Sequence, residues 1–370
     1  MKKSILAFVV IALAIGLSFT YFGRYIFWNF ADIGDYRRFP SVIVQKGGKI
    51  FSFNETASKT EPGIPSSYLT PEDARDFDQF MREQQTVAFI VIQNDTLLTE
   101  KYYDGFSRKS IIPVFSVVKS VVSALAGIAI DEGAVHSVDE PVTNYVKGFR
   151  HEGFEQITLE HLLNMRSGIS YSEEYFNPFS EMARFYYGKN LDRYVYNSRI
   201  KEDPDLHYDY ISVNAQIVAM IIENATGKSI PVYLSEKLWS RIGMEYDASW
   251  SLDSEKNRRV KAFCCLNVRP LDLAKFARLY LHQGQWEGEQ VISSEWVRKS
   301  ISITNDSRDS GGYPYHYFWR VLEDGSYFAK GILGQYLYVD PSRQLIMLRL
   351  GKKAGEVDWI NFFREYVKEM

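Results

Sequence analysis

The stretch that most restricts the fold of this chain is FSVVKSVVSALAGIAID, residues 115–131. Its apolar residues recur at the spacing of a helix that begins near Phe115 and is apolar on most of its surface. Such a helix is stable only when other elements surround it, so it must lie inside a sizeable domain. A chain of 370 residues, 46% of them hydrophobic, can supply that domain.

Strand patterns occur on both sides of this helix along the chain. TVAFIVI (86–92) and TLLTEKYY (96–103) are separated by an Asn-Asp turn, and together they predict an antiparallel hairpin. Near the C-terminus, YFWRVL (317–322), GQYLYVD (334–340) and QLIMLRL (344–350) have the composition of further strands. The last segment, EVDWINFFREYVKEM, predicts a final helix.

The N-terminus carries a long uncharged run. The twenty residues between Lys3 and Arg24 are long enough, as a helix, to span a bilayer, and aromatic residues follow them. We expect residues 1–28 to be a membrane anchor, with a cleaved signal peptide as the alternative. Lys2 and Lys3 favour an N-terminus inside the cell and a catalytic domain outside the cytoplasm. Residues 29–83 are expected to form a linker and docking segment.

Several classes of function find no support in the sequence. The formal net charge is −3 and no Lys/Arg-rich block occurs, so nucleic acid is not an expected partner. The six histidines are scattered and none forms H-E-x-x-H, so we predict no metal and no cofactor. A G-x-S-x-G motif is absent from the sequence. Cys264 and Cys265 are adjacent and cannot close an ordinary disulfide loop, which suggests small core residues or, alternatively, a functional thiol.

Ser116 and Lys119 lie one turn apart near the start of the predicted helix. A serine hydroxyl is a weak nucleophile and needs a neighbouring base. A lysine kept from water by apolar neighbours such as Val117 and Val122 can give up its proton and act as that base. The start of a helix also offers free N–H groups that stabilise an oxyanion. The alternative is a core lysine whose ammonium simply extends to solvent.

Beyond this pair, six segments in order resemble the serine β-lactamase and penicillin-binding-protein superfamily, in its class C-like branch of esterases and 6-aminohexanoate-dimer hydrolases. The similarity covers about residues 85–365. The segments are residues 115–146, ITLEHLLNMRSGI (157–169), HYDYISVNAQIVAMIIENATGKSI (207–230), LWSRIGMEYDASW (238–250), RPLDLAKFARLYLHQGQW (269–286) and AKGILGQYLYVDP (329–341).

The resemblance assigns roles to individual residues. Ser116 becomes the acylated nucleophile and Lys119 its base partner. In the second family motif, Y-x-N, the tyrosine is Tyr210, and a phenol beside a lysine can pass protons to and from the leaving group. Ser212 stands in the asparagine position, with Asn214 two residues further on, and both are expected to contact substrate.

The third family motif is altered in this sequence. Its usual Lys or His is replaced by Ala329, followed by Lys330 and Gly331. Lys330 is offset by one residue, which on a strand turns a side chain to the opposite face, so we do not expect it to substitute for the missing cation. Gly331 permits close approach of substrate, Ile332 supplies the second oxyanion N–H beside that of Ser116, and Gln335 is a further expected substrate contact.

The strand patterns and the resemblance together predict an α/β (α+β) fold of the β-lactamase/transpeptidase type. An antiparallel sheet flanked by helices would occupy residues 84–370, with an inserted helical lobe at about 130–260. The expected function is a serine acyl hydrolase acting on a small ester or amide through an acyl-enzyme on Ser116. The alternatives are a membrane-tethered, non-catalytic binding module, or a true β-lactamase or DD-peptidase. Because position 329 lacks a cation, neutral esters are expected to be better substrates than penicillins, unless Arg166, Arg269 or Lys330 reaches the cleft.

Overall fold

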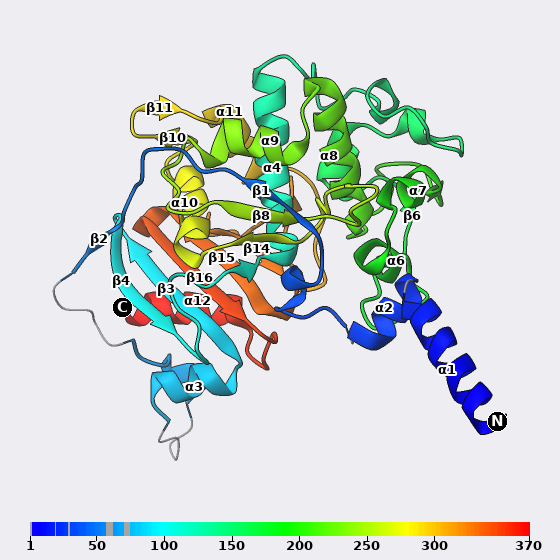
Figure 1. Ribbon diagram of the computed structural model, residues 1–370. Helices are drawn as coiled ribbons and strands as arrows, with labels where there is room; N and C mark the ends of the chain where they lie inside the picture. The colour runs from blue at the N-terminus through cyan, green and yellow to red at the C-terminus, as the bar shows by residue number, and fades with distance from the viewer. Residues whose placement is uncertain (1, 19, 29, 57–61, 70–74) are drawn as a thin grey trace.

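The computed structural model describes residues 2–18, 20–28, 30–56, 62–69 and 75–370 (Figure 1). Its largest sheet has eight strands in the order β12-β13-β14-β15-β16-β3-β4-β2. Neighbouring strands are antiparallel, apart from the parallel pair of β2 and β4. The strands are β2 (Asn54–Glu55), β3 (Thr86–Gln93), β4 (Thr96–Tyr102), β12 (Tyr315–His316), β13 (Trp319–Val321), β14 (Tyr327–Gly331), β15 (Gln335–Asp340) and β16 (Leu345–Gly351). The predicted pairing of the N-terminal hairpin with the C-terminal strands is confirmed.

Helices cover both faces of this sheet. On β3, Phe89 and Val91 belong to one hydrophobic core, and Ala88 and Ile90 belong to the other, as the alternation of side chains along a strand requires. The first core is completed by α3 (Phe77–Glu83) and α12 (Trp359–Glu369), which lies within the segment predicted as the final helix. The second contains α4 (Val118–Asp131), α10 (Pro270–Leu281) and α11 (Ser294–Ser300).

The stretch predicted as a helical lobe is built mainly of short helices. It contains α5 (Leu159–Leu163), α6 (Glu181–Tyr187), α7 (Leu191–Tyr196), α8 (Ser212–Thr226) and α9 (Ile230–Leu234), together with the small sheet of β6 (Ile169–Ser170) and β7 (Arg199–Ile200). The apolar helix α8 packs directly against α4. This contact brings the start of α8 next to the start of α4.

A second sheet incorporates the segment that precedes the main domain. Its strand order is β1-β8-β9-β5, from β1 (Ser41–Val44), β5 (Ile112–Pro113), β8 (Ala248–Ser251) and β9 (Leu266–Val268). The remaining hairpin is β10 (Gln285–Trp286) with β11 (Glu289–Gln290). Phe39 and Val44 are buried. The segment predicted as a linker and docking stretch therefore contributes these two side chains to the folded core. Its residues 57–61 and 70–74 lie outside the described residues.

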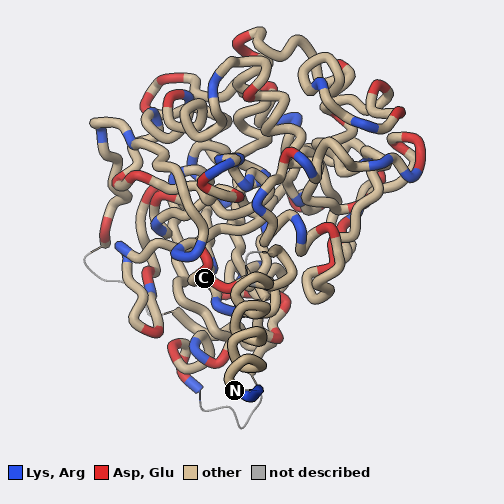
Figure 2. Tube along the Cα trace, turned by 45° about the vertical axis from the view of Figure 1, so that its right-hand side comes forward, with Lys and Arg blue, Asp and Glu red and all other residues tan. Residues whose placement is uncertain are grey.

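The first two helices are α1 (Lys2–Ser18) and α2 (Tyr21–Trp28), and α2 packs on α6. Figures 1 and 2 show α1 projecting from the body, with charged residues only at its start. Among the described residues, no single helix has the length and hydropathy needed to cross a membrane. The two helices meet those criteria as a pair, bent by 102° at the break between them. The predicted anchor stays a prediction.

Candidate active site

Ser116 occupies a tight turn immediately before α4. The turn is the 3-10 helix η3 (Phe115–Val117), and Val114 and Phe115 precede the serine. Phe115 has a φ of 46°, a left-handed conformation that is unfavourable for an aromatic residue. The predicted helix start near Phe115 is thus a separate 3-10 turn that presents Ser116 at the beginning of the buried helix.

The Lys119 ammonium lies beside the Ser116 hydroxyl, as the spacing predicts. Its Nζ is 2.9 Å from Ser116 Oγ, 3.0 Å from the carbonyl oxygen of Phe263 and 3.4 Å from Ser212 Oγ. Lys119 is only 1% exposed. A protonated amine would donate to all three oxygens, whereas a neutral amine would have a lone pair for the serine proton.

Tyr210 lines the same cleft as Ser116. The cleft has a volume of about 440 Å³. Lys119 Nζ lies 4.9 Å from the centroid of the Tyr210 ring, so the amine is next to the tyrosine as well as to the serine. The structure therefore brings together the three residues predicted to be catalytic, Ser116, Lys119 and Tyr210.

The strand β14 reaches the serine turn at Gly331. A Cβ on Gly331 would lie 2.6 Å from the carbonyl oxygen of Val114 and 3.1 Å from the backbone nitrogen of Ser116. Only glycine permits this approach without displacement of the strand. The next residue, Ile332, begins the 3-10 turn η7 (Ile332–Gly334), and the first N–H groups of a helical turn have no partner within it. Ser116 and Ile332, which carry the two expected oxyanion N–H groups, both line the cleft.

Glu173 belongs to the site and was missed by sequence analysis. Its carboxylate accepts hydrogen bonds from Ser212 Oγ at 2.6 Å, from the Ser212 backbone N–H at 2.7 Å and from the Tyr175 hydroxyl at 2.7 Å. Because the Ser212 hydroxyl donates to Glu173, it accepts from Lys119, and a continuous chain joins Glu173, Ser212, Lys119 and Ser116. No sequence motif marks Glu173, which is separated from Ser212 by 39 positions.

The other predicted substrate contacts lie behind the cleft wall. Ser212 is buried and contacts Lys119. Asn214 is also buried, and its side chain accepts from Ser167 Oγ at 2.8 Å. Gln335 bonds to the backbone of Gly351 through both ends of its amide. These three side chains thus have hydrogen-bond partners within the protein. Of the four residues predicted to contact substrate, Gly331 is the one that lines the cleft.

Cationic side chains line the cleft although position 329 is an alanine. Lys330 lines the cleft, together with Arg308 and Arg320. Ala329 is 1% exposed and faces the core, whereas Lys330, on the opposite face of β14, is exposed and lines the cleft. Arg320 pairs with Asp309 and stacks over the Tyr210 ring at 5.6 Å. A poor fit for carboxylated substrates therefore does not follow from Ala329.

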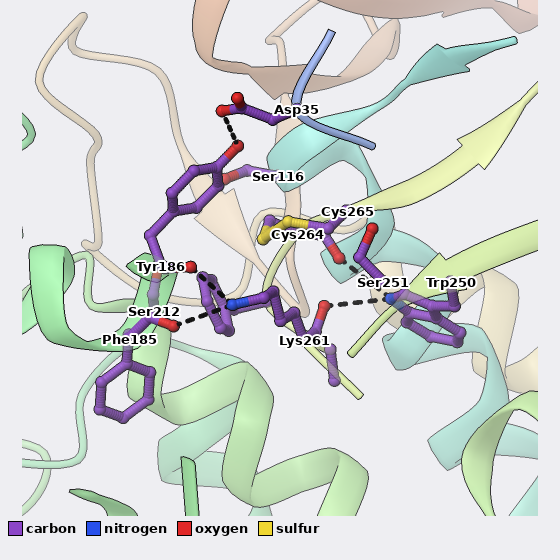
Figure 3. The surroundings of a disulfide bond; sticks show 12 residues. Asp35, Ser116, Phe185, Tyr186, Ser212, Trp250, Ser251, Lys261, Cys264 and Cys265 are labelled. Atoms are coloured by element: carbon purple, nitrogen blue, oxygen red, sulfur yellow. Dashed lines mark hydrogen bonds between the residues drawn. A yellow bond between two sulfur atoms is a disulfide. The ribbon is translucent and has the colours of Figure 1, made fainter. Parts of the chain in front are cut away.

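Cys264 and Cys265 form a disulfide with each other. Both are buried, as predicted for core residues, but neither is a free thiol. Figure 3 shows the disulfide among Ser116, Ser212 and Lys261. The preceding residue, Phe263, supplies the carbonyl that accepts from Lys119. The disulfide is thus part of the loop that contacts Lys119.

Comparisons with known proteins identify relatives of this chain. Residues 74–359 match the Beta-lactamase family. The 6-aminohexanoate-dimer hydrolase of Paenarthrobacter ureafaciens is 26% identical over 343 residues, which cover 87% of this chain and 84% of the relative.

Solved structures share the fold. A candidate 6-aminohexanoate-dimer hydrolase from Bacillus anthracis superposes with a TM-score of 0.80 at 21% identity and covers 93% of both chains. A class C beta-lactamase superposes with a TM-score of 0.60 at 13% identity, covering 79% of this chain and 93% of its own. The chain belongs to the Beta-lactamase family, within the superfamily of serine β-lactamases and penicillin-binding proteins.

Proposed function

We propose that this protein is a serine hydrolase that cleaves a small ester or amide through an acyl-enzyme on Ser116. The observation that carries the proposal is the buried contact of 2.9 Å between Lys119 Nζ and Ser116 Oγ, in a cleft that also holds Tyr210. The relative named as a 6-aminohexanoate-dimer hydrolase supports hydrolysis of an amide or a related ester.

In the acylation step, Ser116 Oγ attacks the substrate carbonyl carbon while Lys119 takes the serine proton. The carbonyl oxygen becomes an oxyanion and accepts hydrogen bonds from the N–H groups of Ser116 and Ile332. Tyr210 donates a proton to the leaving oxygen or nitrogen as the bond to carbon breaks, and it regains a proton from Lys119. A water molecule then attacks the acyl group, the same groups move its proton, and Ser116 is released.

The test is hydrolysis of p-nitrophenyl acetate by the wild type and by two variants, Ser116→Ala and Lys119→Ala. We expect each variant to lose at least about a hundredfold in kcat, because nucleophile and base act as one unit. Circular dichroism should show both variants folded. Turnover of wild type no faster than that of Ser116→Ala would instead favour a non-catalytic binding module.

We also propose that α1 anchors the protein to a membrane. Its apolar side chains are exposed along the helix, for instance Leu6, Phe8 and Leu13 at 65%, 72% and 67%. Burial of such a surface in lipid is favourable. Full-length protein should sediment with phospholipid vesicles, and a chain beginning at Thr20 should stay in the supernatant while keeping its esterase activity. Equal sedimentation of both proteins would contradict the anchor.

A further inference from the structure

A second cavity adjoins the catalytic cleft and is almost entirely apolar. It has a volume of about 400 Å³ and lies between α2, α6 and η7. Its walls include the side chains of Tyr25, Phe30, Met182 and Leu333. None of these residues takes part in the mechanism above, so the cavity is available for a part of the substrate that does not react.

The cavity and the catalytic cleft share a boundary. Tyr175 and Ile332 line both of them. The N–H of Ile332 is a proposed oxyanion donor, so the apolar cavity begins at the residue that would hold the substrate carbonyl. A chain attached to that carbonyl can therefore enter the cavity directly.

The two ends of a bound ester would meet different surroundings. The leaving-group oxygen must lie within hydrogen-bond reach of Tyr210, its proposed proton donor. Tyr210 shares the cleft with Arg308 and Arg320, and neither arginine lines the apolar cavity. The acyl chain extends away from the leaving group, so it is the part of the substrate that is directed toward the apolar side.

Two exposed aromatic rings lie in the wall of the cavity. Phe176 is 79% exposed and Phe30 is 39% exposed, and their ring centroids are 5.3 Å apart. Grouped exposed aromatic residues beside a cavity are typical of a surface that a ligand covers. An apolar chain lying against these rings would remove part of their surface from water.

We propose that this cavity binds the acyl chain of the substrate, so that the enzyme prefers esters or amides of medium-chain fatty acids. The inference rests on the proposed function of Ser116. For scale, a cavity of ~150 Å³ with aliphatic and aromatic walls holds benzene, so a space of about 400 Å³ accommodates a chain of roughly eight carbons.

The test is a series of p-nitrophenyl esters from acetate to decanoate. Each buried methylene can raise kcat/KM by up to about fourfold (~0.8 kcal/mol), so we expect octanoate to exceed acetate by at least about tenfold. The variant Ala354→Trp places an indole in the cavity from an exposed loop. It should lower kcat/KM for octanoate at least about tenfold and leave that for acetate within about twofold.

The matched control is Glu356→Trp, the same substitution two residues away on the same loop, where the exposed side chain does not line the cavity. This control should keep the octanoate preference. A second readout does not need catalysis: octanoate should bind to the Ser116→Ala variant by calorimetry, and adding Ala354→Trp should abolish that binding.

The outcomes separate this inference from the proposed function. If the wild type hydrolyses none of the esters faster than Ser116→Ala does, the proposed function is overturned. Hydrolysis of acetate with no gain along the series, or an octanoate preference that survives Ala354→Trp, would overturn only the acyl-chain site. A preference that appears along a series of alkyl acetates would place the chain on the leaving-group side and would also overturn it.

Discussion

At the scale of single residues, the hydrogen-bond chain from Glu173 to Ser116 is the feature that most needs testing. The carboxylate holds the Ser212 hydroxyl at 2.6 Å, and that hydroxyl is 3.4 Å from Lys119 Nζ. Glu173 does not line the cleft, so we regard it as a positioning residue that acts through Ser212 on Lys119. It should therefore affect the chemical step more than substrate binding.

The variant Glu173→Gln should lower kcat about tenfold with little change in KM, because an amide holds the Ser212 hydroxyl less firmly than a carboxylate does. Steady-state kinetics with p-nitrophenyl acetate measures both constants. Glu174→Gln is the matched control, since Glu174 is exposed and bonds to Asn177 instead. A wild-type kcat in Glu173→Gln would rule out the positioning role.

Lys261 is a buried cation near the site, and it makes stability depend on pH. Burial lowers the pKa of Lys261 to about 7, from an ordinary value of 10.5, although the nearby carboxylates of Asp253 and Asp35 favour the charged form. Arg24 acts in the same direction as burial. Between these two pKa values the unfolded chain binds more protons than the folded chain, so the free energy of unfolding rises with pH in that window.

Chemical denaturation at pH 6 and at pH 9 tests this dependence. The free energy of unfolding of the wild type should rise by about 2 kcal/mol over that range relative to Lys261→Met, which has no titrating group there. Lys256→Met, at an exposed position nearby, should behave like the wild type. The interpretation fails if Lys261→Met and the wild type show the same change with pH.

At the scale of secondary-structure elements, the contact between β14 and η3 sets the distance between the two proposed oxyanion donors. Gly331→Ala would place a methyl group 2.6 Å from the carbonyl oxygen of Val114, and the strand must move to relieve that contact. The N–H of Ile332 moves with the strand. Loss of one oxyanion donor typically lowers kcat about 100- to 1000-fold.

We therefore expect Gly331→Ala to lower kcat for p-nitrophenyl acetate by about 100-fold while the protein stays folded by circular dichroism. Gly48→Ala is the control, because a Cβ at Gly48 meets no atom within 4 Å. An unchanged kcat in Gly331→Ala would show that the approach of β14 to the serine turn is not needed for catalysis.

The elements of the main sheet were predictable because strands rich in apolar residues and a helix that is apolar on most of its surface leave few ways to bury these surfaces. The pairing of β1 with β8 was not predictable. Ser41 and Ser251 pair although they are far apart in the sequence, and neither strand has a sequence pattern that identifies its partner. On β14, Lys330 does lie on the face opposite Ala329, but strand alternation alone did not show that its side chain also lines the cleft.

At the scale of the whole molecule, the site assembles residues that only the fold brings together. Ser116 and Lys119 were recognisable because helical spacing places them in contact. Glu173, Arg320 and the Phe263 carbonyl come from distant segments, and local sequence carries no signal for contacts of this kind. The disulfide of Cys264 and Cys265 was unexpected because adjacent cysteines rarely bond to each other.

The central claim is that Ser116 carries the acyl group, and intact-protein mass spectrometry after treatment with a fluorophosphonate probe tests it most directly. The wild type should gain the mass of one adduct, and peptide mapping should assign it to Ser116. Ser116→Ala should remain unlabelled, and Lys119→Ala should label much more slowly, because the serine has lost its base. An adduct of the same mass and yield on Ser116→Ala would contradict the account.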